Sequence, residues 1–256
     1  MLSLPRVIGH RGAAGSAPEN TLAGLRRAAA LGATWVEIDV QLTADGAVVL
    51  LHDLTLDRTT SGAGPLAAAR LDDLARLDAG AWFGQDFVGE PLPTLDQAVD
   101  QVLSLDLGLN VEIKSERGRA EATGRAAARR LLERWPADRP APLISAGDPA
   151  ALAGVRDVAP HLPRALVQRR PGPAWTFIAA ELRCTGLVLD HRHLGAATCA
   201  HMAREATRIL GPDGALAAYT VNDPERAARL HDWGARSVFS DHPERMTADR
   251  APERAA

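Results

Sequence analysis

The chain has 256 residues, of which 46% are hydrophobic, and this composition excludes an intrinsically disordered protein. The formal net charge of −3 gives no reason to expect nucleic acid or an anionic membrane surface as a partner. We find neither a secretion signal nor an apolar run of membrane-spanning length, so we expect a cytoplasmic protein without stable membrane association. Cys184 and Cys199 lack metal-binding spacing, which predicts reduced thiols.

Short β-rich runs alternate along the chain with longer Ala/Leu/Arg stretches of helical character. This alternation predicts a parallel sheet covered by helices, and eight strands are the number that closes a (β/α)₈ barrel (TIM barrel). We expect one barrel domain over residues 1–256, because about 250 residues is typical of this fold. The predicted strands are Arg6–His10, Trp35–Val40, Leu109–Ile113, Pro142–Ser145, Arg164–Val167, Gly186–Leu189, Leu216–Val221 and Ser237–Ser240.

Helices are predicted between most of these strands, at Thr21–Leu31, Leu95–Leu103, Arg119–Glu133, Pro149–Asp157, Ala196–Leu210 and Pro224–Trp233. The link after Val167 is short and contains Pro171, Gly172 and Pro173, and no helix is predicted there. We expect the last dozen residues, Arg245–Ala256, to form a frayed tail.

A ninth β-run, Ala47–His52, follows Val36–Thr43 through Ala44-Asp45-Gly46. Asp-Gly between two β-runs is a strong signal for a two-residue hairpin turn. In such a turn Ala44 pairs with Ala47, and Asp39 then faces His52, with about 5 Å between their Cβ atoms. The segment that follows, residues 54–93, is too long for a plain loop, so we expect a small insertion with a helical patch near Leu71–Leu77.

The first candidate site residues are His10 and Arg11, between Gly9 and Gly12 at the end of the first strand. Active sites of this barrel lie at that end of the strands. An arginine can bind a phosphate with two hydrogen bonds, and a histidine can transfer a proton near neutral pH. A turn with two surface side chains explains the tetrapeptide about equally well.

Glu37 and Asp39 lie two residues apart on the second strand, and their side chains therefore point to the same side. Burying two carboxylates together is very costly without a cation, whereas a metal at the rim of the barrel removes this cost. Hard oxygen ligands favour Mg²⁺ or Ca²⁺. The predicted hairpin adds His52 beside this pair, as a candidate acid or base.

Glu112 and Lys114 share a face of the next parallel strand, and Glu112 completes a set of three carboxylates for a hard cation. Three carboxylates and one divalent cation leave a charge of −1, so a bound phosphodiester needs nearby positive charge, which Lys114 and Arg11 can supply. Lys114 is the only lysine among 29 Lys and Arg residues. A compact point charge is therefore expected at this position, rather than any cation.

Three further motifs are weaker. Pro18–Thr21 precedes a helix, and capping explains much of it. The pair His191 and His193 resembles a metal-binding pair but is more typical of a solvated loop. Tyr219 ends a late strand, where its ring can line the mouth of a pocket.

Together these residues resemble the glycerophosphodiester phosphodiesterase family. The matching runs span nearly the whole chain in order: IGHRGAAGSAPENTLAG, WVEIDVQLTADGAVVLLHDLTLDRTTSG, LDAGAWFG, LPTLDQAV, LNVEIK, YTVND and FSDHPE. The resemblance implies a barrel with an insertion after the second strand. It implies a divalent metal on Glu37, Asp39 and Glu112, acid–base catalysis by His10 and His52, and phosphate binding by Arg11 and Lys114.

The implied reaction hydrolyses a small glycerophosphodiester to glycerol 3-phosphate and an alcohol, and it leaves open which histidine is the acid. Ala146-Gly147-Asp148 and Tyr219 stand where family members often carry Ser-Phe-Asp and Trp, which bears on the shape of the pocket. Two alternatives remain: an enzyme similar to phospholipase D or C that acts on lysophospholipids, and a catalytically silent binding protein. The first requires an apolar patch beside the pocket, for which the insertion offers Trp82, Phe83 and Phe87.

Overall fold

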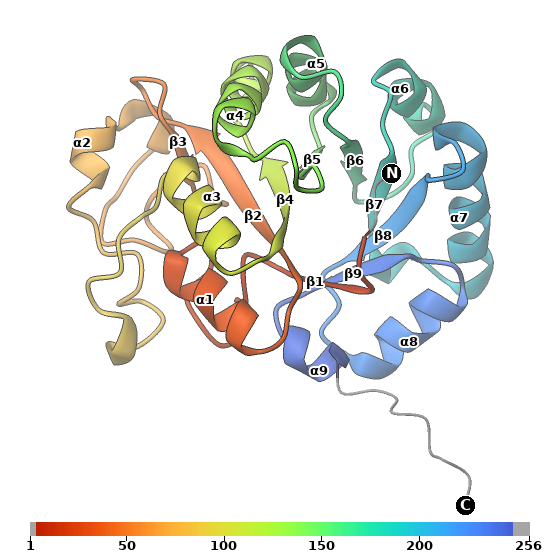
Figure 1. The fold of residues 1–256 in the computed structure, drawn as a ribbon, viewed down its shortest axis with the longest axis horizontal. Helices are drawn as coiled ribbons and strands as arrows, with labels where there is room; N and C mark the ends of the chain where they lie inside the picture. Colours follow the sequence, from red (N-terminus) through yellow and green to blue (C-terminus); the bar gives the residue numbers. More distant parts are fainter. Residues whose placement is uncertain (1–3, 248–256) are drawn as a thin grey trace, which may run out of the picture.

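In a computed structural model that describes residues 4–247, eight parallel strands form a closed barrel (Figure 1). The barrel closes where β1 pairs with both β2 and β9, with Gly9 opposite Val36 and Ser240. The predicted (β/α)₈ fold is confirmed, and each predicted strand overlaps an observed one. The parallel strands are β1 (Val7–Gly9), β2 (Trp35–Leu42), β4 (Gly108–Ile113), β5 (Leu143–Ala146), β6 (Arg164–Gln168), β7 (Gly186–Asp190), β8 (Ala215–Tyr219) and β9 (Ser237–Ser240).

Helices surround the barrel because every other strand residue points outward and is apolar. On β2, Val36, Ile38 and Val40 pack under the helices, while the alternate residues face the interior. A smaller cluster that includes Ile8, Val188 and Phe239 fills the interior. The helices are α1 (Leu22–Ala30), α3 (Leu95–Ser104), α4 (Ala120–Arg134), α5 (Pro149–Val158), α6 (Trp175–Glu181), α7 (Ala196–Leu210), α8 (Pro224–Asp232) and α9 (Pro243–Thr247).

Helix α6 was not predicted, and its ends explain why. Several other helices begin at a Thr or Asp whose side chain accepts a backbone hydrogen bond, as at Thr21 and Asp148. At α6 the N-cap is Ala174, which has no side chain capable of this bond. Pro171 and Pro173 precede it, so the sequence carries loop signals and lacks the usual signal for the start of a helix.

Strand β3 (Val48–Leu50) pairs antiparallel with β2, as predicted, but in a different register. Leu50 lies opposite Val40, and the backbone N–H of Thr43 donates to Ala47. The loop therefore has three residues, 44–46, with Gly46 at φ +84°, instead of the predicted two. Asp39 consequently bonds across to Leu51, so the predicted pairing of Asp39 with His52 is wrong.

Residues 54–93 lie beside the barrel, at the left of Figure 1, and contain short helical turns. These are η1 (Leu66–Ala68), α2 (Leu71–Leu74) and η2 (Gln85–Phe87). The helical patch predicted at Leu71–Leu77 is thus a single short helix that ends at Leu74. The segment packs Leu56, Leu66 and Leu74 against Val49 and Leu51 of the hairpin, which gives it a small apolar core next to β3.

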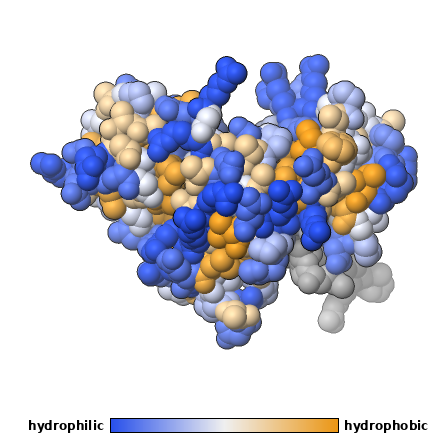
Figure 2. All heavy atoms as spheres, turned by 90° about the horizontal axis from the view of Figure 1, so that it is seen from above, coloured by the Kyte–Doolittle hydropathy of each residue, from blue (hydrophilic) through white to orange (hydrophobic). Residues whose placement is uncertain are grey.

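The C-terminal prediction is partly wrong, because Arg245–Thr247 belong to α9. The rest of the predicted tail, residues 248–256, lies outside the described residues. On the face drawn in Figure 2, hydrophobic side chains form small separate patches among hydrophilic ones. Among the helices of residues 4–247, none combines the length and the apolar character that crossing a bilayer requires.

Candidate active site

The parallel pairing of β2 and β4 brings three carboxylates together inside the barrel. Asp39 lies directly opposite Glu112, and Glu37 is two residues earlier on β2. One oxygen from each of the three carboxylates lies within 4.8 Å of the others, and in the described part of the chain no other group of three His, Cys, Asp or Glu residues does so. Glu37 and Asp39 are buried, and Glu37 Oε1 and Asp39 Oδ1 have no hydrogen-bond donor.

These two buried oxygens fit a cation. Burial, together with the charges of Asp39 and Glu112, holds the pKa of Glu37 well above its usual value. Burial would also raise the pKa of Asp39, but Lys114 and Arg11 outweigh it and lower this pKa to about 2. The surroundings thus disfavour the ionised form of Glu37, whereas oxygen ligands around a hard divalent cation can all remain ionised.

Lys114 follows β4 directly, and its ammonium faces the carboxylates. Lys114 Nζ lies 3.4 Å from Asp39 Oδ1 and also forms a close ion pair with Glu112. Burial lowers the pKa of Lys114, but the charges of Asp39 and Glu112 outweigh it and raise the pKa. The side chain is 25% exposed, so this positive charge can also reach a ligand from the open end of the barrel.

His10 and Arg11 occupy a tight turn at the end of β1. Arg11 has φ +50° and Gly12 φ +87°, and a Cβ at Gly12 would lie 2.6 Å from the backbone of Gly24. The backbone N–H of Arg11 donates to Glu37 Oε2 at 2.9 Å, and Arg11 Nε lies 3.1 Å from Asp39 Oδ2. This strained backbone places a guanidinium against the carboxylates of β2.

His52 reaches the same site because the strand ends before it, not because it pairs with Asp39. In the observed register, continuing the ladder would place His52 opposite Ile38, on the outward face. Instead the chain turns after Leu51, and the amide of Gln41 donates to the carbonyl oxygens of Leu51, His52 and Asp53 at 2.9, 3.3 and 2.6 Å. This side chain takes the place of ladder bonds and turns His52 toward the site.

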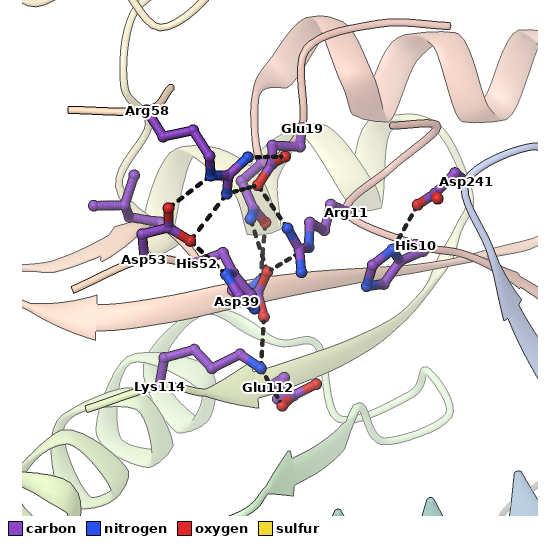
Figure 3. Close-up of polar contacts among 12 residues, drawn as sticks. His10, Arg11, Glu19, Asp39, His52, Asp53, Arg58, Glu112, Lys114 and Asp241 are labelled. Carbon is purple, nitrogen blue, oxygen red and sulfur yellow. Dashed lines mark hydrogen bonds and ion pairs between the residues drawn. The ribbon is translucent and has the colours of Figure 1, made fainter. Parts of the chain in front are cut away.

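Each of the two histidines has an aspartate partner (Figure 3). His10 Nδ1 lies 2.6 Å from Asp241 Oδ1, and His52 Nδ1 lies 2.7 Å from Asp53 Oδ1. Asn222 donates to the second oxygen of Asp241 at 2.7 Å. In each histidine Nδ1 is thus engaged, and Nε2 is the nitrogen available for proton transfer.

A cavity of about 160 Å³ opens at the ends of the strands above the carboxylates. Its polar side contains five of the seven predicted site residues, and the other two, Glu37 and Asp39, lie buried beside them. Val167, Val188 and Phe239 form an apolar wall, and Tyr219 also lines the cavity, as predicted from its position. The lining residues on the polar side are His10, Arg11, His52, Glu112 and Lys114.

Five further residues at this site were not among the predicted site residues, although Glu19 and Asn20 belong to the weaker motif Pro18–Thr21. Asn20 donates to Asp39 Oδ2 and accepts from the Asp39 backbone N–H, both at 2.9 Å, and Glu19 accepts from Arg11 at 2.7 Å. The motif Pro18–Thr21 also contains Thr21, which caps helix α1, and this capping role was a sufficient explanation of the motif at the level of sequence. The other three are Asp53, Arg58 and Asp241. His191 and His193 do not join the carboxylates; they contact Arg226 and Arg170.

Comparison with known proteins identifies relatives of one family. Residues 10–245 match the model of the glycerophosphoryl diester phosphodiesterase family. A glycerophosphodiester phosphodiesterase of Bacillus subtilis is 29% identical over 95% of this chain and 86% of its own length. One of Caldanaerobacter subterraneus is 48% identical, over 43% of this chain and 45% of its own length.

A solved structure of an Oleispira antarctica phosphodiesterase, in complex with the product sn-glycerol-3-phosphate, is similar over the whole barrel. It has 36% sequence identity and a TM-score of 0.89, and the match covers 96% of each chain. A glycerophosphodiester phosphodiesterase from Thermotoga maritima, 22% identical with a TM-score of 0.72, shares the fold.

Proposed function

The chain belongs to the glycerophosphoryl diester phosphodiesterase family and is a phosphodiesterase, and we propose that it cleaves small glycerophosphodiesters with one divalent cation and a pair of histidines. The observation that carries this proposal is one cavity lined by two histidines, two cationic side chains and Glu112, with Glu37 and Asp39 buried directly beside it. The products would be glycerol 3-phosphate and an alcohol.

Glu37, Asp39 and Glu112 would hold the cation, Mg²⁺ or Ca²⁺. All three ligands are carboxylates, and a set of oxygen ligands without nitrogen or sulfur favours a hard ion. The buried oxygens without donors, Glu37 Oε1 and Asp39 Oδ1, support this assignment. When bound, the cation supplies positive charge to a phosphoryl oxygen and lowers the pKa of a hydroxyl beside it.

His10 and His52 would move the protons. The aspartate at each Nδ1 fixes the ring and leaves Nε2 toward the reacting atoms. One histidine takes the proton of an attacking glycerol hydroxyl, and the other gives a proton to the departing alcohol. Attack from within the substrate is favoured by effective concentration, and water would then open the resulting cyclic phosphate.

Arg11 and Lys114 would hold the phosphate. Three carboxylates and a divalent cation sum to −1, and the phosphodiester adds another negative charge, so two nearby cations offset the repulsion. Trp82, Phe83 and Phe87, the apolar patch that a lysophospholipid would require, do not line this cavity, which supports a small substrate. The product named in the Oleispira antarctica complex is the glycerol 3-phosphate proposed here.

The test is turnover of glycerophosphocholine by the purified protein before and after chelation. We expect EDTA to abolish activity and added Mg²⁺ or Ca²⁺ to restore it, because the divalent cation would supply the charge that stabilises the phosphoryl oxygen and lowers the pKa of the attacking hydroxyl. Full activity in protein stripped of metal would contradict the cation assignment while leaving the family assignment intact.

A further inference from the structure

A chain of charged side chains connects residues 54–93 to the carboxylates of β2 (Figure 3). Its centre is Arg58, whose guanidinium contacts two carboxylates at once. Arg58 Nε and Nη2 donate to the two oxygens of Asp53 at 2.6 and 3.0 Å. Arg58 Nη1 and Nη2 donate to the two oxygens of Glu19 at 2.8 Å each. One guanidinium thus holds two carboxylates, each with a pair of bonds.

Each of these carboxylates in turn holds a residue of the proposed catalytic centre. Asp53 Oδ1 is the partner of His52 Nδ1, at 2.7 Å. Glu19 Oε1 accepts from Arg11 Nη1, at 2.7 Å, and Arg11 Nε then faces Asp39. The contacts therefore run without a gap from His52 through Arg58 to Arg11.

The charges along this chain keep both carboxylates ionised. The hydrogen bonds from Arg58 are the largest cause of the lowered pKa of Asp53. Burial would raise the pKa of Glu19, but Arg58 and Arg11 outweigh it and lower this pKa. An ionised carboxylate can only accept, so Asp53 fixes the proton of His52 on Nδ1. Without Arg58, both carboxylates would lose their bidentate partner, and among the described residues each would be held only by its single bond to Arg11 or His52.

We infer that Arg58 is a positioning residue that orients His52 through Asp53 and Arg11 through Glu19. The inference rests on the proposed roles of His52 and Arg11, and it assigns to residues 54–93 a part in assembling the catalytic centre. Direct binding of substrate by Arg58 is the competing explanation. Four of the five N–H groups of its guanidinium already donate to Asp53 and Glu19, which favours the positioning role.

The experiment compares Arg58→Ala and Arg58→Lys with the parent, and Arg76→Ala, an exposed arginine of the same segment, serves as the matched control. We expect Arg58→Ala to lower kcat by roughly 10–100-fold, the usual range for a residue that orients a site ligand. It should also weaken binding of glycerol 3-phosphate, measured by calorimetry with metal present. Arg58→Lys should recover only part of each loss, because an ammonium cannot form both pairs of bonds. Arg76→Ala should match the parent.

The contact of Arg58 through Asp53 to His52 and the contact through Glu19 to Arg11 should have different kinetic effects. We expect Asp53→Asn to lower kcat with little change in the affinity for glycerol 3-phosphate, and Glu19→Gln mainly to weaken that affinity. In the Asp53→Asn, Glu19→Gln double variant, adding Arg58→Ala should have little further effect, because the residues act as one unit. A full, additive loss on adding Arg58→Ala would show direct contact with substrate and overturn the inference.

Equal kcat and equal affinity for Arg58→Ala and Arg76→Ala would also overturn it. Circular dichroism melts of every variant distinguish a loss of folding from a misplaced side chain. If Arg58→Ala does not fold, the comparison of Arg58→Lys with the parent tests the inference instead. His52→Ala, assayed beside them, decides the acid–base proposal separately, because normal kcat in that variant refutes the role of His52 whatever Arg58 does.

Discussion

At the scale of single residues, the two histidines are matched by position and by partner. Each has an aspartate at Nδ1, and both line the same cavity. We expect His10→Ala and His52→Ala each to lower kcat by at least ~10²-fold, as for general acid–base residues, with the fold unchanged. The measurements are steady-state kinetics and a thermal melt. A variant that unfolds, or that keeps near-normal kcat, would identify that histidine as structural.

Lys114 offers a second test at this scale, because its charge can be kept while its shape is changed. The ammonium faces Asp39 and Glu112 in a small cavity, where a planar guanidinium is larger and differently hydrated. We expect Lys114→Arg to lower kcat/KM by roughly 10-fold or more, about 1.4 kcal/mol of transition-state binding. Thermal stability should change little, since the group lies at the open end of the barrel. A kcat/KM within twofold of the parent would show that any cation serves there.

At the scale of elements, the hairpin of β2 and β3 depends on one buried amide. Gln41 donates to three consecutive carbonyl oxygens, Leu51 to Asp53, where the strand pairing has ended. Gln41→Met keeps the length of the side chain and removes the donor. We expect a destabilisation of about 1–3 kcal/mol, since buried carbonyls lose their partner, and a lower kcat because His52 is no longer held.

Denaturant unfolding and kinetics check this expectation, with Gln85→Met on the exposed η2 turn as the control. Unchanged kcat in a destabilised Gln41→Met protein would mean that His52 is held in place without the amide.

Some of these elements could be predicted from the sequence, and others could not. Alternating apolar residues predicted the strands, and the spacing of Glu37 and Asp39 placed both inside the barrel. The hairpin register could not be fixed, because Asp-Gly suits loops of two and three residues, and the bond from the Ala47 N–H to Thr43 Oγ1 accompanies the longer loop. Asp53 follows His52 directly in the chain, and this local pair was available to sequence reasoning, but no role was assigned to Asp53. Arg58 was missed, and Glu19 was rated only a weak candidate, because their contact joins segments 39 residues apart, which no local pattern reveals.

At the scale of the whole molecule, the two ends of the barrel differ in chemistry. At the end opposite the site, Arg164 is 2% exposed, and its guanidinium donates to backbone carbonyls that include those of Leu162 and Leu182. Those bonds satisfy the buried charge and join neighbouring segments. At the site end, by contrast, Glu37 and Asp39 leave buried oxygens without donors. Lys114 and Arg11 offset part of the negative charge there, and the two oxygens without hydrogen-bond donors lie where the divalent cation is proposed to bind.

This arrangement predicts that metal and pH act together on the stability of the fold. The pKa of Glu37 in the folded chain lies above its ordinary value of 4.5, so the unfolded chain loses this proton first as pH rises. The contribution of Glu37 to the free energy of unfolding is therefore largest below pH 4.5, and it declines as the pH rises toward the pKa of Glu37 in the folded chain. Asp39, with a pKa of about 2, contributes no further change above pH 5.

In metal-free protein we therefore expect Tm to fall from pH 5 to pH 8 by more in the parent than in Glu37→Gln, whose side chain cannot ionise. A divalent cation would displace the proton of Glu37 and offset the charge of all three carboxylates, so it should raise the parent Tm more at pH 8 than at pH 5. Melts at both pH values, with EDTA or with Mg²⁺ or Ca²⁺, measure both effects, and the difference between parent and Glu37→Gln removes the contribution of other titrating groups. If that difference does not vary with pH, Glu37 is not the group that links protons, metal and stability in this barrel.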